Sequence, residues 1–158
     1  MKIFKVFTIF IFFLTFKAIA DEITGSPIIT DGDTIKIINK RIRLHGIDAP
    51  ESKQLCKKNS KEYRCGIIAT EALVKKINKN QVRCIVQDRL DRYKRYIGVC
   101  FVEAINLNQW MVRNGHAVAY RRYSKDYIKD EDYAKKINLA YGRVILLIRK
   151  NGESLIKF

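Results

Sequence analysis

The sequence predicts a mainly β domain with added helices, an α+β fold built around a small barrel. Several short apolar stretches, each long enough for one strand, are separated by turn residues such as Asp, Asn and Gly. Strands and helices do not alternate regularly, which argues against a parallel βαβ sheet. With 158 residues, 47% of them hydrophobic and 30% charged, the chain has the size and composition of one globular domain.

The first half of the chain supplies the expected strands of a meander. Residues 28–38 form the start of a hairpin around a DGD turn, and residues 41–45 form a strand whose polarity alternates. One face of this strand carries Ile42 and Leu44, and the other carries Arg41, Arg43 and His45. Pro50 ends the strand region because it has no N–H to donate to a sheet. Residues 52–65 are expected to form a polar loop.

The second half contributes one hairpin and three helices. The expected elements are a helix at 66–80, strands at 81–86 and 96–102 around a charged loop at 88–95, a helix at 107–114 capped by Asn106, an extended basic segment at 118–123, and a polar helix at 125–138. The helix at 66–80 is expected to bury Ile68, Ala69, Ala72, Leu73 and Ile77. The helix at 107–114 is expected to bury Leu107, Trp110 and Met111. An OB-type five-stranded Greek-key barrel with about three helices fits this order and size.

The N-terminus is typical of a secretory signal peptide. Two lysines precede an apolar run at 7–16, and a small-x-small cleavage site follows at 18–20. The run is short for a membrane span, which takes about 20 residues. An uncleaved N-terminal anchor is the alternative, and it stays open because Lys17 lies within the region before the cleavage site. We expect residues 1–20 to be a signal peptide, residues 21–158 to be a single domain, and the protein to be secreted or periplasmic.

The chain is strongly basic, with a formal net charge of +15 at pH 7. Residues 1–20 hold three lysines and no acid, so +12 remains on the exported part. Such an excess creates a field that attracts polyanions, and the expected partners are nucleic acid or an anionic envelope surface. A solvated basic surface without a partner is the alternative, and net charge alone does not distinguish them.

Four cysteines lie in the exported part, and an even number in an exported chain predicts two disulfides. Three pairings are possible. We expect Cys56–Cys65, which would close a local loop, and Cys84–Cys100, which would join two neighbouring strands. A zinc site is the alternative, but the sequence has no CxxC motif.

One stretch, residues 31–51, collects acids in an otherwise basic chain. Its charged residues include Asp31, Asp33, Arg43, Asp48 and Glu51. Asp33 and Asp48 are expected at the ends of adjacent strands, so they can meet at one rim of the barrel. Carboxylates bind hard cations such as calcium or magnesium, with Asp31 as a third ligand or just behind the ligands. A simple Asp-Gly turn is the structural alternative for the DGD motif.

Two arginines and a glutamate complete the predicted site. Arg43 and Arg95 each carry a fork that can hold two oxygens of a phosphate. Glu51 would activate or orient water for attack on a phosphodiester. The residues expected to stack on a base or bond a phosphate are Tyr93, Tyr120 and Tyr123, with packing at the barrel edge as an equal alternative. The two histidines, His45 and His116, are expected to be structural.

These motifs resemble those of the staphylococcal-nuclease-like, or thermonuclease, family. The matching segments are DGDT at 31–34, RLHGIDAPE at 43–51, DRYKR at 91–95 and WMVRNGHAVAYRRYS at 110–124, within residues 26–136. The resemblance implies an OB-fold barrel and calcium-dependent hydrolysis of DNA and RNA. It also implies individual roles: Asp33, Asp48 and the backbone carbonyl of Ala49 hold Ca2+ with Asp31 close behind, Arg43 and Arg95 clamp the phosphate, Glu51 is the general base, and Tyr93, Tyr120 and Tyr123 border the nucleotide pocket.

Two places depart from the family pattern. Lys94 stands where the family usually has glycine, which indicates a turn with positive φ. Residues 139–158 form a divergent tail with an apolar run at 144–148. We expect a monomeric, calcium-dependent phosphodiesterase acting on DNA and/or RNA, without a stable protein partner. It would contact a membrane only if the signal peptide is retained. The alternative is a catalytically weakened OB-fold nucleic-acid-binding protein of the envelope.

Overall fold

A computed structural model describes residues 21–58 and 61–137. The predicted signal peptide and the divergent tail at 139–158 lie outside the described residues. Within these ranges, no helix is both long enough and apolar enough to cross a bilayer.

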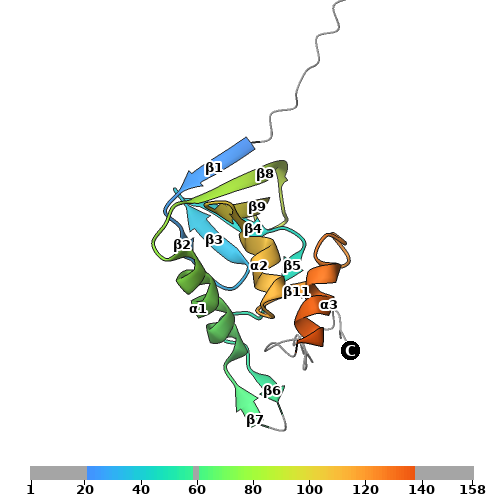
Figure 1. The fold of residues 1–158 in the computed structure, drawn as a ribbon. Helices are drawn as coiled ribbons and strands as arrows, with labels where there is room; N and C mark the ends of the chain where they lie inside the picture. The colour runs from blue at the N-terminus through green and yellow to red at the C-terminus, as the bar shows by residue number, and fades with distance from the viewer. Residues whose placement is uncertain (1–20, 59–60, 138–158) are drawn as a thin grey trace, which may run out of the picture.

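The centre of the molecule is a mixed sheet that closes on itself (Figure 1). Its strands are β1 Asp21–Gly25, β2 Ile28–Ile29, β3 Thr34–Ile37, β4 Lys40–Leu44, β8 Val82–Leu90 and β9 Tyr96–Val102, in the order β1-β8-β9-β4-β3-β2. β1 and β2 lie at the two ends of this order, yet only two residues separate them in the chain. They act as two halves of one bent strand, so the path has five strands and forms a barrel.

Strand direction confirms the predicted OB-type topology. β4 pairs with β9 in parallel, while β1–β8, β8–β9, β3–β4 and β2–β3 pair antiparallel. A long connection, residues 45–81, therefore leads from the meander to the β8–β9 hairpin. The alternation predicted for β4 is present, because Ile42 and Leu44 are fully buried while Arg41 is exposed and Arg43 half-buried. The fold is mainly β with three helices, as predicted.

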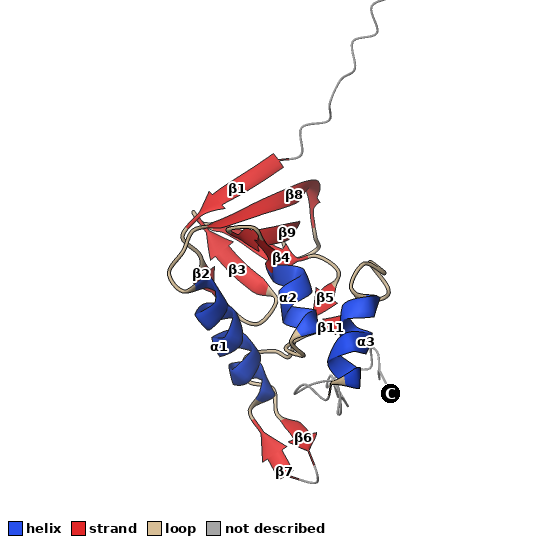
Figure 2. Cartoon of the chain, in the orientation of Figure 1, coloured by secondary structure: helices blue, strands red, loops and turns tan. Residues whose placement is uncertain are grey.

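Three helices cover the open end of the barrel (Figures 1 and 2): α1 Cys65–Ile77, α2 Leu107–Arg113 and α3 Ile128–Lys136. Asn106 caps α2 as predicted, its side chain accepting a hydrogen bond from the backbone N–H of Gln109 at 3.0 Å. Four short strands lie outside the barrel path and form two separate pairs: β5 Ile47–Asp48 with β11 Val118–Ala119, and β6 Cys56–Lys58 with β7 Lys61–Tyr63. A fifth short strand, β10 Ile105–Asn106, pairs with β9.

Some expectations about single elements are wrong. β1 was not expected, and β8 continues to Leu90, so the charged loop starts only at Asp91. Residues 52–65 contain a hairpin as well as loop, and residues 121–123 form a turn instead of continuing β11. In α1, Ile68 is 40% exposed, whereas its predicted core neighbours Ala69, Leu73 and Ile77 are buried. Trp110 on α2 is only half-buried.

Both disulfides have the predicted pairing. Cys56–Cys65 joins β6 to the start of α1, with the two Cα atoms 5.6 Å apart. Cys84–Cys100 joins residues that are direct partners in the β8–β9 hairpin. Disulfides persist in oxidising surroundings such as the extracellular space or the periplasm, which is the kind of environment that this chain suits.

Candidate active site

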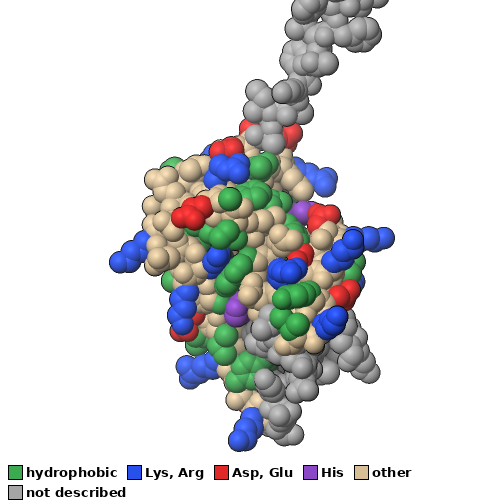
Figure 3. All heavy atoms as spheres, viewed as in Figure 1, with side chains coloured by type: hydrophobic (Ala, Val, Ile, Leu, Met, Phe, Trp, Pro, Cys, Tyr) green, Lys and Arg blue, Asp and Glu red, His purple; other side chains and the backbone are tan. Residues whose placement is uncertain are grey.

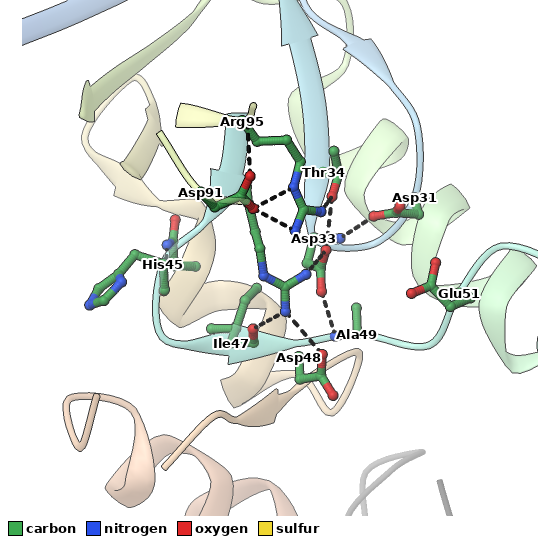
Figure 4. A network of polar contacts seen from close by, with 12 residues as sticks. Asp31, Asp33, Thr34, His45, Ile47, Asp48, Ala49, Glu51, Asp91 and Arg95 are labelled. Carbon is green, nitrogen blue, oxygen red and sulfur yellow. Dashed lines mark hydrogen bonds and ion pairs between the residues drawn. The ribbon is translucent and has the colours of Figure 1, made fainter. Parts of the chain in front are cut away.

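The predicted charged residues come together at one rim of the barrel, where the DGD turn, β4, β5 and the β8–β9 loop meet (Figure 4). The turn is closed by the backbone N–H of Asp33, which donates to Oδ1 of Asp31 at 2.9 Å. Gly32 lets this turn lie against the next segment, because a Cβ on it would come within 2.7 Å of the Ala49 Cβ. Residues 31–33 and 48–49 are therefore held side by side.

Asp33 is the centre of the hydrogen-bond network, although only 4% of it is exposed. Its Oδ1 accepts from the Arg43 Nη1 at 2.7 Å and from the Thr34 hydroxyl at 3.0 Å, and its Oδ2 accepts from the Ala49 backbone N–H at 3.1 Å. A carboxylate buried to this degree needs such partners. The Ala49 contact seen here is through its N–H, while the role predicted for its carbonyl stays a prediction.

Arg43 lies between two carboxylates. Its Nη1 contacts Asp33, and its Nη2 donates to Oδ1 of Asp48 at 3.0 Å and to the carbonyl of Ile47 at 3.2 Å. Its side chain is 14% exposed. Burial alone would lower the pKa of Arg43, but the charges of Asp33 and Asp48 outweigh it and raise the pKa. The guanidinium is therefore a fixed positive charge that faces the site.

Asp31 and Glu51 add further negative charge on the other side of Asp33. Burial and then the charge of Asp33 raise the pKa of Asp31 to about 6, with a smaller contribution from Glu51. Figure 4 shows the exposed Glu51 with its carboxylate directed toward the space beside Asp31 and Asp33. Three carboxylates that repel one another at a part-buried rim have the donor chemistry that suits a hard cation.

The side chains at the rim provide only some of the ligands that a bound cation would need. Among residues 21–58 and 61–137, no three His, Cys, Asp or Glu side chains form a ready-made metal cage. Two of the predicted ligands, Asp33 and Asp48, instead hold Arg43. A cation at this rim would therefore need water or substrate oxygens to complete its coordination, which is common for hard cations at phosphate sites.

Arg95, unlike Arg43, is held by contacts with a residue of its own loop. Its Nε and Nη2 contact Oδ2 of Asp91 at 2.9 and 2.8 Å, and its backbone N–H donates to Oδ1 of Asp91 at 2.9 Å. Burial alone would raise the pKa of Asp91, but these hydrogen bonds outweigh it and lower the pKa. Lys94, between them, has a φ of 58°, which confirms the expected left-handed turn.

Thr34 joins the two arginine sites. Its hydroxyl donates to Oδ1 of Asp33 at 3.0 Å and accepts from the Arg95 Nη1 at 3.2 Å, and Thr34 is 1% exposed. Neither Thr34 nor Asp91 is among the site residues that the sequence predicts. The spacing of Asp91 and Arg95 at i and i+4 could have indicated their pairing, whereas Thr34 and Arg95 are 61 residues apart and no local signal connects them.

The three tyrosines lie beside the two arginines. Tyr93 is 55% exposed, and the guanidinium carbon of Arg95 is 5.2 Å from its ring centroid. Tyr120 has the guanidinium carbon of Arg43 5.9 Å from its ring, and it meets the ring of Tyr123 edge-on at 4.8 Å. The structure therefore places the predicted tyrosines at the edge of the charged site. Of the two histidines, His45 points away from the carboxylates in Figure 4.

Comparison with known proteins agrees with this arrangement. The model of the family described as staphylococcal nuclease homologue matches residues 41–144. The succinoglycan biosynthesis protein ExoI of Rhizobium meliloti (strain 1021) is 37% identical over 102 residues, which are 63% of this chain and 53% of that protein. An uncharacterized endonuclease of Escherichia coli O157:H7 is 30% identical over 128 residues, 77% of each protein.

A third relative is the micrococcal nuclease of Shigella flexneri, which is 34% identical over 110 residues, 61% of this chain and 58% of that protein. The chain thus spans about half the length of the Rhizobium relative and about three-quarters of the Escherichia coli one. The family model covers well over half of the chain, and the strand order, the two disulfides and the charged rim agree with the match. The chain therefore belongs to the family of staphylococcal nuclease homologues.

Proposed function

We propose that the protein is a nuclease, a hydrolase of phosphodiester bonds in DNA and/or RNA, that depends on Ca2+. Family membership supports the nuclease activity, and the relatives named endonuclease and micrococcal nuclease point the same way. The observation that carries the proposal is the pair of part-buried arginines, Arg43 and Arg95, joined through Asp33 and Thr34 at the rim. A rim that combines fixed cations with carboxylates suits a phosphodiester bound together with a cation.

The two guanidinium groups would bind the scissile phosphate. Each presents forked N–H donors, and neither group loses its charge at neutral pH. Their carboxylate partners hold them in place before substrate arrives, so little reorganisation is needed when charge builds up on the phosphate oxygens. Tyr93, Tyr120 and Tyr123 lie beside the arginines and would contact the nucleoside parts next to that phosphate.

The carboxylates would bind the cation, as the arginines would bind the phosphate. Asp33, Asp48 and the carbonyl of Ala49 would hold Ca2+, with Asp31 close behind. When bound, the cation would offset the phosphate charge and polarise its oxygens. Asp31 and Glu51 raise the negative potential at this point, so they favour a cation and would repel a phosphate that came without one.

Glu51 would accept a proton from the attacking water, or at least orient that water. It is the exposed carboxylate of the group and is directed toward the space beside Asp33. Its backbone is fixed on both sides: its N–H donates to the side chain of Gln54 at 3.2 Å, and its carbonyl accepts from the Gln54 N–H at 2.7 Å. Gly66 packs against it so closely that a Cβ there would overlap the Glu51 carbonyl oxygen.

The remaining expectations belong to the same proposal. The protein would act as a monomer without a stable protein partner, and it would be exported to the periplasm or the medium. The two disulfides support an oxidising location. Contact with a membrane would follow only from a retained N-terminal segment.

The test compares the parent protein with Glu51→Gln on single-stranded DNA, duplex DNA and RNA, in Ca2+ and in EGTA. We expect cleavage by the parent only in Ca2+, and a loss of about 10²- to 10⁴-fold in kcat for Glu51→Gln, as for removal of a general base. Glu71→Gln is the matched control, because Glu71 is an exposed acid on α1. Salt-dependent binding by the parent without any cleavage in Ca2+ would instead identify a nucleic-acid-binding protein.

A further inference from the structure

The chain leaves the charged rim through a tight turn, residues 51–54, whose two ends hold each other. The backbone N–H of Gln54 donates to the Glu51 carbonyl at 2.7 Å, and the Glu51 N–H donates to Oε1 of the Gln54 side chain at 3.2 Å. A glutamine that reaches back three residues in this way makes the same reciprocal pair of bonds as a capping box, here in a turn that no helix follows. One residue therefore fixes both peptide groups of the proposed general base.

Gln54 is itself anchored to the start of α1. Its carbonyl accepts from the Gly66 N–H at 3.2 Å, and the Sγ of Cys65 lies 3.4 Å from the same oxygen. The Cys56–Cys65 disulfide ties the chain two residues after Gln54 to the first residue of the helix. The turn is therefore attached to a rigid element by a hydrogen bond and by a covalent link.

The first turns of α1 also fix the place of Glu51 relative to the DGD turn. A Cβ on Gly66 would overlap the Glu51 carbonyl oxygen, so glycine is what lets the two backbones meet. Three residues later, on the same side of the helix, Ala69 packs against the DGD turn, because a Cβ on Gly32 would come within 3.0 Å of the Ala69 Cβ. One helix thus supports both the general base and the neighbouring acids.

Charge does not distinguish this turn from the rest of the surface. Lys53 within it is exposed, but Lys and Arg side chains are scattered over the whole face seen in the space-filling view (Figure 3). The distinguishing feature is Gln54, which is half-buried and uses its side chain, its N–H and its carbonyl in the contacts described above. An uncharged side chain with this set of contacts suits a role in geometry.

We propose that Gln54 is a positioning residue for catalysis: it fixes the Glu51 backbone on the start of α1 and so directs the Glu51 carboxylate to the place of the attacking water. Figure 4 shows this carboxylate directed toward the space beside Asp31 and Asp33. The inference rests on the proposed function and adds to it a residue that touches neither the phosphate nor the cation. Such a residue matters because a misplacement of about 1 Å at a reacting group costs on the order of 10²-fold in rate.

The kinetic test uses Gln54→Met, which keeps the approximate size of the side chain and removes the acceptor oxygen. Both kcat and KM are measured in Ca2+, in the parent and in a Glu51→Gln background, so that the four proteins form a double-mutant cycle. Gln81→Met is the matched control, because Gln81 is an exposed glutamine between α1 and β8. Circular dichroism and thermal unfolding verify that the variants fold like the parent.

A second measurement needs no activity. Solvent exchange of the Glu51 and Ala49 amide protons is followed by NMR in EGTA. The Glu51 N–H donates to Gln54, whereas the Ala49 N–H donates to Oδ2 of Asp33, so Ala49 is the internal reference. Gln54→Glu joins this comparison because it keeps an acceptor oxygen at the same place.

We expect Gln54→Met to lower kcat about tenfold, the effect of one lost hydrogen bond, with KM within about twofold of the parent. In the Glu51→Gln background the same change should alter kcat by less than about twofold, because the carboxylate that Gln54 positions is already gone. The Glu51 amide should exchange about tenfold faster in Gln54→Met and at the parent rate in Gln54→Glu, with Ala49 unchanged in both. Gln81→Met should match the parent throughout.

The proposal is overturned if Gln54→Met keeps the kcat of the parent. It is also overturned if Gln54→Met lowers kcat equally in both backgrounds, since an equal loss means that Gln54 supports the fold and does not act through Glu51. Equal exchange of the Glu51 amide in Gln54→Met and Gln54→Glu would show that the side-chain contact does not hold the backbone. If the parent cleaves nothing in Ca2+, the proposed function fails, while the amide comparison still decides whether Gln54 holds Glu51.

Discussion

The two arginines at the rim are held in contrasting ways. Arg43 on β4 is held by Asp33 and Asp48, which come from different segments, and by the carbonyl of Ile47. Arg95 is held by Asp91, four residues earlier in the same loop. The position of Arg43 therefore depends on the assembled barrel, whereas that of Arg95 depends mainly on one turn.

The difference also concerns the cation. The carboxylates that hold Arg43 are the proposed ligands of Ca2+, so the arginine and the cation share the same acids. Asp91 has no such second role. Its partner Arg95 is connected to Asp33 through the Thr34 hydroxyl, which accepts from Arg95 and donates to Asp33. Changes at Arg43 should therefore affect folding, cation binding and catalysis together, while loss of the charged contact between Asp91 and Arg95 should affect catalysis with little effect on the fold.

Arg43→Gln should give the largest effect. Removing one charged donor to the developing phosphate charge costs about 10²- to 10³-fold in kcat/KM. It also leaves the carboxylates of Asp33 and Asp48 part-buried without their cation, which should lower the free energy of unfolding by about 3 kcal/mol. Initial rates in Ca2+ and urea unfolding in EGTA measure the two effects separately.

Arg43→Lys is the control for this prediction. It keeps the charge but not the fork, so most of the stability should return while the activity stays low. Full activity in Arg43→Lys would show that the forked geometry is unimportant. Unchanged stability in Arg43→Gln would show that the two carboxylates do not need the arginine.

Asp91→Asn should have a smaller effect, confined to the Arg95 side. Arg95 would lose its charged partner but keep the hydrogen bond to Thr34, so we expect a loss of about tenfold in kcat/KM and less than about 1 kcal/mol in unfolding free energy. The folded-state pKa of Asp91 lies below its usual 3.8. Its stabilising contribution is therefore complete above about pH 4 and is lost as the pH falls through the folded-state pKa.

The pH dependence provides the check on Asp91→Asn. The gap in unfolding free energy between the parent and the variant should be constant from pH 7 down to about pH 4 and should close below it. Asp88→Asn, which changes an exposed acid near the end of β8, is the control and should show no gap. A gap that widens on acidification would contradict the assignment of the Arg95 contact to a charged Asp91.

Elements of the fold were predictable from the sequence where a local residue pattern alone defines them. Alternation in β4 placed Ile42 and Leu44 inside, and Asn106 marked the start of α2. β1 was missed because its sequence, DEITG, has one buried apolar residue, Ile23, and it is defined by pairing with β8 some 60 residues later. β8 was expected to end at Val86, since the next three residues, at 87–89, are polar and exposed although they remain in the strand.

The sequence predicts which residues form the charged rim, but it does not predict which of them contact one another. The motifs at 31–34 and 43–51 indicated the acids and Arg43, and the structure places them together. The sequence does not show that Asp33 and Asp48 hold Arg43, because that contact depends on how the strands pair. Nor does it connect Thr34 with Arg95, which meet only when β9 packs beside β4.

Lys94→Gly should give the smallest effect and tests whether the Arg95 turn carries strain. A non-glycine residue with φ near 58° costs about 1–2 kcal/mol, and glycine avoids this cost but loses more entropy on folding. We expect a net gain of about 0.5–1 kcal/mol in unfolding free energy by urea denaturation, with kcat/KM within about twofold of the parent. Asn39→Gly, at a φ of 64°, is the control and should gain less, because Asn tolerates this conformation. A Lys94→Gly variant that is less stable than the parent would mean that the lysine side chain itself stabilises the loop and that Arg95 depends on more than Asp91.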